Sequence, residues 1–313
     1  MAGTSGSGHL PSAGSAGGVP LAGSGVGGAA AGSAGTARAA GSAAAAGGSG
    51  QASAGTSGAA APTTGDCDRA CLLQFMQGYL DALVAKDPAK LKVSATVKFT
   101  DNGVVAKLGD GLWKTATKLV PDLRLDFADP VEGQVATHVV VDEGAATGVI
   151  YQARLKIVKQ EITEIETMTV RRSGAANGFF NTANMKPEPA FLVAVEPAKR
   201  MSRADLKAIT ELYLDYLEGS KSGSQVPFDT NCKRYENGQA TATGLSSFMT
   251  QSWSFAVTRR ILIIDEEAQI TWGMFPFQQS ASALVVGEAF KIVGGKITMI
   301  QAVMANMPTK AWD

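Results

Sequence analysis

An internal repeat constrains this chain more than any other feature of its sequence. The ten residues at 156–165 recur at 291–300, with the same opening Lys-Ile-Val and the same Ile-Thr pair, at an offset of 291 − 156 = 135 residues. The turn sequence Asp-Asn-Gly at 101–103 recurs as Glu-Asn-Gly at 236–238 with the same offset. Matches that keep one order and one spacing indicate that a domain has been duplicated.

The repeat divides the 313 residues into four segments, 1–65, 66–172, 173–200 and 201–313. The first is almost wholly Gly, Ala, Ser and Thr, with Arg38 as its only charge. Such a segment cannot bury enough apolar surface to offset the entropy lost on ordering, so we predict a disordered tail. The second and fourth segments are the two copies, each large enough for its own core, and the third, with three prolines, is predicted to be a linker.

The charge balance argues against a nucleic-acid partner. Residues 66–313 contain 28 − 1 = 27 Lys and Arg, because Arg38 lies in the tail, against 28 Asp and Glu, a net charge of 27 − 28 = −1. Proteins that bind nucleic acid or anionic membranes usually carry a clear excess of basic residues. No apolar run approaches the roughly 18 residues of a membrane helix, so no transmembrane segment is predicted.

Two cellular locations stay open. The first residues lack both a basic stretch and an apolar core of the secretory type, which predicts a cytoplasmic protein if the sequence is taken as written. Yet long Gly/Ala/Ser tails before a folded domain are similar to the spacers of bacterial surface lipoproteins. An extracytoplasmic or surface-tethered location is expected if a signal segment is missing.

The first copy begins with helical spacing and continues with strand spacing. Apolar residues from Leu72 to Val84 recur every three or four positions, after Asp66 and Asp68, which can cap a helix. Pro88 ends that helix or starts a short second one. From Val97 the apolar period becomes two, which predicts strands. The strands expected after the 101–103 turn form an antiparallel meander over 124–127, 135–142, 148–158 and 161–171.

The second copy repeats this plan. Ser202 and Asp205 form a weak capping box before an apolar stripe that ends at Leu217, and Gly294 and Gly295 give the strongest hairpin signal in the chain. Helices followed by strands predict an α+β fold in each copy.

Several short runs resemble one known superfamily. In the first copy these lie at 97–103, 109–113, 127–130 and 162–167, and in the second at 226–228, 234–238, 259–260, 264–267 and 288–292. They are similar to the nuclear-transport-factor-2-like (SnoaL-like) superfamily, and more closely to a branch of tandem proteins of unknown function in bacteria and filamentous fungi. The resemblance covers nearly all of 66–313 and none of the tail.

The resemblance implies two cone-shaped domains, each with helices packed on a strongly curved antiparallel sheet around an apolar cavity. It also implies that the two sheets pack face to face, as an intramolecular pseudo-dimer. Members of the superfamily use the cavity for isomerisation, cyclisation or dehydration, whereas others only bind partners. The fold therefore does not give the function, and no functional residue is transferred.

The three cysteines have two interpretations. Cys67 and Cys71 lie one turn apart at a helix start, and we expect them to be buried or capping thiols, with a bridge from this helix to Cys232 as the alternative. The resembling branch usually has a second cysteine near the position of Cys232. This chain has none at 244–250, which puts a disulfide within the second copy in doubt.

The candidates for acid–base chemistry are few. His138, the only histidine outside the tail, is a candidate general base, although a half-exposed strand position explains it better. Asp126 is the preferred carboxylate, and Asp101, Glu166, Glu236, Asp265 and Glu288 are the other acids considered. A single histidine precludes a histidine-based metal site within one copy, and no phosphate loop or dinucleotide fingerprint occurs, so no metal or cofactor is predicted.

Aromatic residues are better candidates for lining a pocket, because they combine apolar area with a polar tip. The candidates are Tyr79, Trp113 and Tyr151 in the first copy, and Tyr213, Tyr235 and Trp272 in the second. Ordinary core packing explains Tyr79 and Tyr213 equally well.

Two functions remain open from the sequence. In one, a cone binds a small apolar ligand as a substrate for weak acid–base chemistry or as a ligand alone, and the first copy is favoured because it holds Trp113 and His138. In the other, the pair is a non-catalytic binding or scaffold module on a tether. An open cavity with an ionisable group inside would favour the first function, and a cone filled with Leu, Met and Phe would favour the second.

Overall fold

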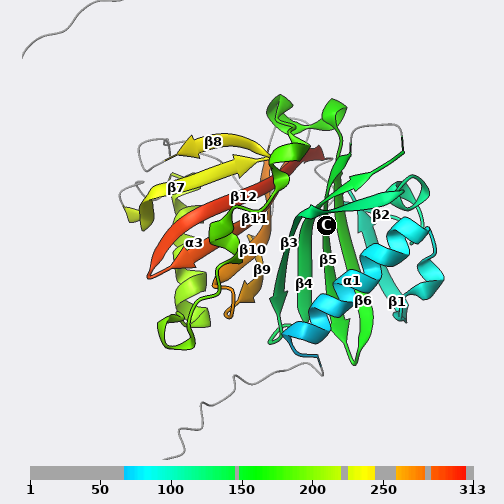
Figure 1. Cartoon of the computed structure of the whole chain (residues 1–313), viewed down its shortest axis with the longest axis horizontal. Helices are drawn as coiled ribbons and strands as arrows, with labels where there is room; N and C mark the ends of the chain where they lie inside the picture. The colour runs from blue at the N-terminus through cyan, green and yellow to red at the C-terminus, as the bar shows by residue number, and fades with distance from the viewer. Residues whose placement is uncertain (1–66, 145–147, 220–224, 244–258, 279–282, 308–313) are drawn as a thin grey trace, which may run out of the picture. The chain divides into compact units, whose positions relative to one another are not determined.

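The computed structural model describes residues 67–144, 148–219, 225–243, 259–278 and 283–307. The tail predicted at 1–65 lies outside these residues. Two six-stranded sheets account for most of the described chain, and each is preceded by one long helix (Figure 1). Among the described residues, no helix is both long and apolar enough to cross a membrane.

The two sheets have the same strand order, as the sequence repeat predicts. The first sheet is ordered β2-β1-β6-β5-β4-β3 and the second β8-β7-β12-β11-β10-β9. The first contains β1 (Val93–Asp101), β2 (Val104–Val105), β3 (Lys118–Asp129), β4 (Gln134–Asp142), β5 (Val149–Val158) and β6 (Glu161–Val170). The second contains β7 (Phe228–Glu236), β8 (Gln239–Thr243), β9 (Arg260–Asp265), β10 (Ile270–Gln278), β11 (Ala283–Val293) and β12 (Lys296–Met307).

Both sheets are mixed, so the prediction of purely antiparallel sheets is wrong. The meander from β3 to β6 is antiparallel, but β1 pairs with β6 in parallel, and β7 pairs with β12 in the same way. Consecutive hairpins favour antiparallel pairing, whereas β1 and β6 are far apart along the chain. The last strand of each meander lies beside the strand that opens its sheet unit, β1 or β7, and runs in the same direction.

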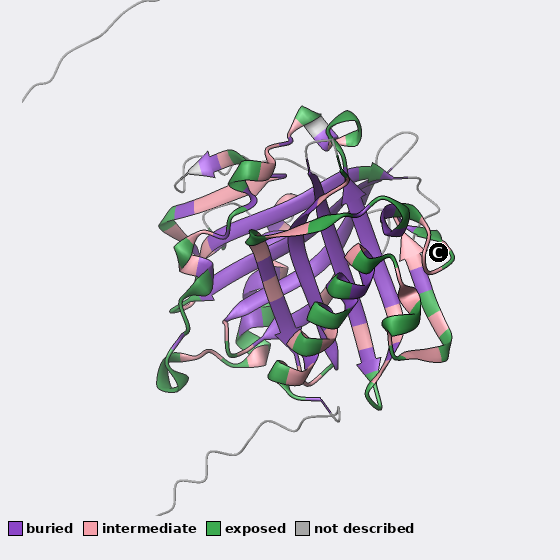
Figure 2. Cartoon of the chain, turned by 45° about the vertical axis from the view of Figure 1, so that its right-hand side comes forward, coloured by how far each residue is buried: buried purple, intermediate pink, exposed green. Residues whose placement is uncertain are grey.

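The long helices α1 (Arg69–Ala85) and α3 (Arg203–Leu217) form where the apolar spacing predicts them. Asp68 accepts a hydrogen bond from the Cys71 amide at the start of α1, and Ser202 accepts one from the Asp205 amide at the start of α3. In α1, Leu72, Met76, Tyr79, Leu80 and Leu83 are buried against the first sheet. The outward turns of α1 are exposed, whereas the strands are largely buried (Figure 2).

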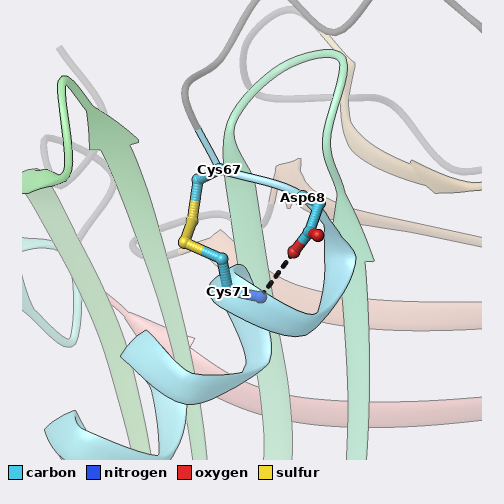
Figure 3. The surroundings of a disulfide bond; sticks show 3 residues. All are labelled: Cys67, Asp68 and Cys71. Atoms are coloured by element: carbon cyan, nitrogen blue, oxygen red, sulfur yellow. Dashed lines mark hydrogen bonds between the residues drawn. A yellow bond between two sulfur atoms is a disulfide. The ribbon is translucent and has the colours of Figure 1, made fainter.

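A disulfide joins Cys67 to Cys71 at the start of α1 (Figure 3). The expectation of free thiols at these positions is therefore wrong, and so is the alternative bridge to Cys232, which is a free, buried thiol. One helical turn separates the two cysteines, and their Cα atoms lie 5.3 Å apart, within the range that a disulfide spans. The bridge links the residue before the cap to the first turn of the helix.

The segment predicted to be a linker is packed against both sheets. Its Phe180, Met185 and Phe191 are buried in a core shared by residues of the two sheets. The short helices outside the sheets are η1 (Pro88–Lys90), η2 (Gly111–Lys114), η3 (Arg172–Gly174), η4 (Ala176–Gly178), η5 (Thr182–Met185), α2 (Pro189–Leu192) and η6 (Pro197–Lys199).

Contacts between the two sheets are reciprocal. Arg69 of α1 binds Asp265 at the end of β9, with Nη2 to Oδ2 at 3.0 Å, and Arg203 of α3 binds Asp129 at the end of β3 at 2.7 Å. Each aspartate also accepts a backbone hydrogen bond from the other sheet, Asp265 from the Ala128 amide at 3.0 Å and Asp129 from the Ile264 amide at 2.8 Å. The same two contacts, an arginine–aspartate ion pair and a backbone hydrogen bond to the aspartate, therefore occur in both directions between the two units.

Candidate functional site

The interior of the second sheet unit contains a buried cluster of polar side chains. Glu288 on β11 is fully buried, and it forms an ion pair with Arg234 on β7. Tyr213 on α3 donates a hydrogen bond to Glu288 Oε1 at 3.3 Å and accepts one from Arg234 Nη1 at 2.8 Å. Arg234 Nε also donates to Glu236 Oε1 at 2.8 Å. We call Tyr213, Arg234 and Glu288 the polar triad.

Strand alternation places Glu288 in this interior. Successive side chains of a strand point to opposite faces, so Glu288 lies on the same face as Val286 and Phe290. Both neighbours belong to the apolar core of the second sheet unit. Phe228 and Phe290 pack against the ring of Tyr213, with centroid distances of 6.0 and 4.9 Å. The triad therefore interrupts an otherwise apolar and aromatic row.

Burial gives the triad unusual electrostatics. Loss of solvent raises the pKa of Glu288 above its ordinary value, although the nearby Arg234 and the hydrogen bond from Tyr213 act in the opposite direction. Burial also raises the pKa of Tyr213 well above its ordinary value. The Oε2 atom of Glu288 has no hydrogen-bond partner among the described residues. A buried carboxyl oxygen without a partner can bind a polar atom of a ligand or exchange a proton with it.

In the first sheet unit, aromatic side chains occupy the interior where the second unit has an ion pair. The hydroxyl groups of Tyr79 and Tyr151 lie 2.7 Å apart within hydrogen-bonding distance, and the ring of Trp113 packs edge-on to Tyr79 at 5.5 Å. All three predicted pocket residues of this copy are thus in one place, fully packed in its core. At the repeat offset, Phe99 corresponds to Arg234, since 234 − 99 = 135, and Ala153 to Glu288, since 288 − 153 = 135.

The half-exposed position predicted for His138 is wrong. Its side chain is 1% exposed, and Nε2 accepts a hydrogen bond from Trp272 Nε1 of the second sheet at 3.0 Å. Burial lowers the pKa of His138 to about 3, so the imidazole is neutral at neutral pH. Even-numbered residues of β4 face the core shared by both sheets, which places His138 there and not beside α1. The predicted pocket residue Trp272 lies in that same shared core.

The remaining predicted residues lie near the surface. Asp126 on β3 forms an ion pair with Arg124 at 2.8 Å and borders a surface cleft. Tyr235 on β7 donates a hydrogen bond to Glu188, which raises the pKa of Tyr235 to about 12. Asp126 belongs to the first sheet, and Tyr235, although it follows Arg234 on β7, points to the opposite face of that strand from the polar triad.

In the sequence alone, Glu288 is one acid among several, and nothing beside Arg234 assigns it a role. A usable signal was present in the repeat. Opposite charges occur in the second copy at two positions that are apolar in the first, Phe99 and Ala153. Two opposite charges that replace apolar residues on strands facing the same interior indicate a buried ion pair. Within the described residues, no three His, Cys, Asp or Glu side chains are grouped so that they could hold a metal ion.

Comparison with known proteins identifies one domain. Residues 199–304 match a family described as a domain of unknown function (DUF8021). This match covers the second sheet unit and carries no activity. A search of curated proteins found no match.

Among solved structures, the chain is similar to a de novo designed protein with a curved β-sheet. The two are 11% identical, with a TM-score of 0.26 over 33% of this chain and 87% of the designed one. At that score the similarity supports no argument about function.

Proposed function

We propose that this protein is a tandem nuclear-transport-factor-2-like (SnoaL-like) protein whose second copy binds a small, mainly apolar carbonyl compound at the polar triad. The observation that carries the proposal is the buried Glu288 carboxyl, one oxygen of which lacks a protein partner. Aromatic rings beside Tyr213 supply apolar contact area for such a ligand. A carbonyl oxygen of the ligand would accept a hydrogen bond from the Tyr213 hydroxyl, and the raised pKa would make the ionised Glu288 carboxyl a stronger base.

The same carboxyl would support acid–base chemistry of the isomerase, cyclase or dehydratase type. In its ionised form Glu288 would remove a proton from the carbon next to the carbonyl. That proton would move to Glu288, and the negative charge to the carbonyl oxygen. Tyr213 lies within hydrogen-bond distance of Glu288, so its hydroxyl is placed to stabilise an oxygen bound there.

A cone shape for each sheet unit and a pseudo-dimeric arrangement are part of this proposal. Register irregularities interrupt the strand pairs at Lys156/Ile157 and at Lys291/Ile292, and bulges of this kind increase local twist and bending. The reciprocal arginine–aspartate contacts match those of an isologous interface, in which each partner contributes the same patch.

A thermal-shift screen of small ketones, including steroid-like and polyketide-like compounds, tests the binding. Because a ligand that binds only the folded state raises Tm, at least one compound is expected to raise Tm in a dose-dependent way. The matched control is the double variant Arg234→Phe/Glu288→Ala, which places the residues of the first copy at these two positions. It is expected to fold and to lose the shift. A shift that persists in this variant would contradict binding at the triad.

Proton exchange tests the chemistry separately. Incubation of a bound ketone in D2O, followed by NMR, is expected to show faster exchange of the hydrogens next to the carbonyl with the wild type than with Glu288→Gln. The exposed Glu196→Gln is the control and should exchange like the wild type. Equal rates in all three would leave a binding protein without acid–base activity.

The scaffold function is the second candidate, and the close packing of both interiors favours it. Tyr79, Trp113 and Tyr151 of the first are each 2% exposed or less. Tyr213, Glu288 and Phe290 of the second are also 2% exposed or less. If no compound shifts the Tm of the wild type while the fold is intact, the scaffold function is preferred, and the search moves to protein partners.

A further inference from the structure

A surface cleft lies away from the polar triad, where α1, β3, the segment after α2 and the turn before β10 meet. Its volume is about 340 Å³, within the range of small-molecule sites. It continues along α1 and β3 into a shallower depression that also borders Leu73, Arg124 and Asp126. The cleft is built from both sheet units and from the connecting segment.

Most of the residues that border this cleft are apolar, although polar groups form about half of its surface. Leu73, Leu125, Phe191 and Ile270 border it, together with Leu192 and Val193. Leu192 is 66% exposed and Val193 61% exposed, and they are two of only six large apolar side chains that are exposed among the described residues. Exposed apolar residues that gather at a concave site indicate a binding surface more strongly than scattered ones.

A buried lysine holds two borders of the cleft together. Lys291 Nζ donates hydrogen bonds to the Val193 carbonyl at 2.8 Å and to the Ala268 carbonyl at 2.6 Å. Val193 lies after α2 and Ala268 in the β9–β10 turn, and both border the cleft. The lysine therefore fixes the connecting segment against the second sheet, so that the cleft is formed before any ligand binds.

The rim carries two arginines and two acids, so its charges balance, and the Nη1 group of Arg69 is the point at which an anion could compete. Arg124 is already paired with Asp126 at 2.8 Å and donates to Gln77. Arg69 uses Nε and Nη2 for Asp265, whereas its Nη1 lies 3.8 Å from Glu267, beyond hydrogen-bond distance. The Glu267 side chain is 55% exposed, so a ligand carboxylate can take its place at Arg69 with little loss.

We propose that this cleft binds an aliphatic monocarboxylate of medium chain length. The carboxylate binds Arg69 Nη1 in place of Glu267, and the hydrocarbon chain lies on Leu73, Leu192 and Val193. This site is separate from the polar triad and does not depend on the function proposed for it.

Calorimetric titration of the full chain with decanoate, below its micellar concentration, tests the proposal. Decan-1-ol is the matched uncharged ligand and is expected to bind about tenfold more weakly, because it loses the hydrogen bond to a charged donor. Glu267→Gln removes the competing carboxylate and is expected to tighten decanoate binding by about threefold, the size of a weak surface ion pair. A gain in affinity cannot result from misfolding.

A second pair of variants locates the site. The exposed Ala194 borders the cleft, so Ala194→Trp is expected to fill it and abolish decanoate binding. Ala89→Trp adds the same bulk at an exposed position outside the cleft and is expected to bind like the wild type. The proposal is overturned if decanoate does not bind, if decan-1-ol binds as tightly, or if Ala194→Trp leaves the affinity unchanged. Assembly of the chain through this cleft, seen as loss of binding on concentration, would also overturn it.

Discussion

The two sheet units enclose interiors of different chemistry within one strand order. The first holds a neutral pair of tyrosines, Tyr79 and Tyr151, whereas the second holds an ion pair between Arg234 and Glu288. Either buried charge alone would lack compensation, because moving an unpaired ion out of water costs several kcal/mol. The two charges must therefore be gained or lost together, and a duplicated fold tolerates the exchange when both positions change.

Removing one charge should have the largest effect. Glu288→Ala is expected to lower the free energy of unfolding by about 3–5 kcal/mol, because Arg234 stays buried with Glu236 as the one carboxylate that pairs with it among the described residues. Urea unfolding measures the change. The double variant Arg234→Phe/Glu288→Ala should recover most of the loss, and a double variant no more stable than the single one would contradict the coupling.

Acid should weaken the core that the two sheets share. Burial lowers the pKa of His138 from 6.5 in the unfolded chain to about 3, so the folded state favours the neutral ring. The resulting stability is complete above pH 6.5 and is lost as the pH falls toward 3. The expected loss is about 2 kcal/mol at pH 5, since each pH unit in this window costs about 1.4 kcal/mol.

Unfolding of His138→Gln is the control for the acid effect, because glutamine does not titrate and retains an acceptor for the Trp272 indole. The variant is expected to lose less stability than the wild type between pH 7 and 5. Equal losses in the two proteins would assign the acid sensitivity to other groups.

Removing one hydroxyl from each interior should have a smaller effect. Tyr79→Phe leaves the Tyr151 hydroxyl buried without this partner, and a cost of about 1–2 kcal/mol is expected. Tyr213→Phe removes contacts to two charged groups, so a somewhat larger cost is expected in the second unit. Thermal unfolding of both variants measures the difference, and a larger cost at Tyr79 would reverse the comparison.

Changes at the starts of the two long helices should have the smallest effects on stability, and the two effects should be similar in size. Reduction of the Cys67–Cys71 disulfide is expected to cost about 1–2 kcal/mol, because a loop of so few residues restricts the unfolded chain less than a long loop does. Ser202→Ala at the other helix removes a capping hydrogen bond and is expected to cost about 1 kcal/mol. Unfolding with and without dithiothreitol measures the first, and a loss of several kcal/mol on reduction would show that the bridge supports more than one helix end.

Local patterns predicted the elements well because they act over a few residues. The spacing from Leu72 to Val84 gave α1, and the Asn-Gly turn at 102–103 lies between β1 and β2, with φ of 48° and 75°. The parallel pairing of β1 with β6 was missed because it joins residues distant in the chain. The contact of His138 with Trp272 was missed for the same reason, since 134 residues separate them. The alternation of residue types in β4 distinguishes its two faces, but it does not reveal that both faces are buried.

The reciprocal contacts of Arg69 with Asp265 and of Arg203 with Asp129 imply that the two halves can associate without a covalent connection between them. Each half carries one arginine and one aspartate of this exchange, together with part of a shared apolar core. A chain cleaved between the halves therefore keeps a recognition surface on each fragment, and we expect two co-expressed fragments to reassemble. For the same reason, two intact chains at high concentration can form a domain-swapped dimer. In that dimer each arginine pairs with the aspartate of the other molecule.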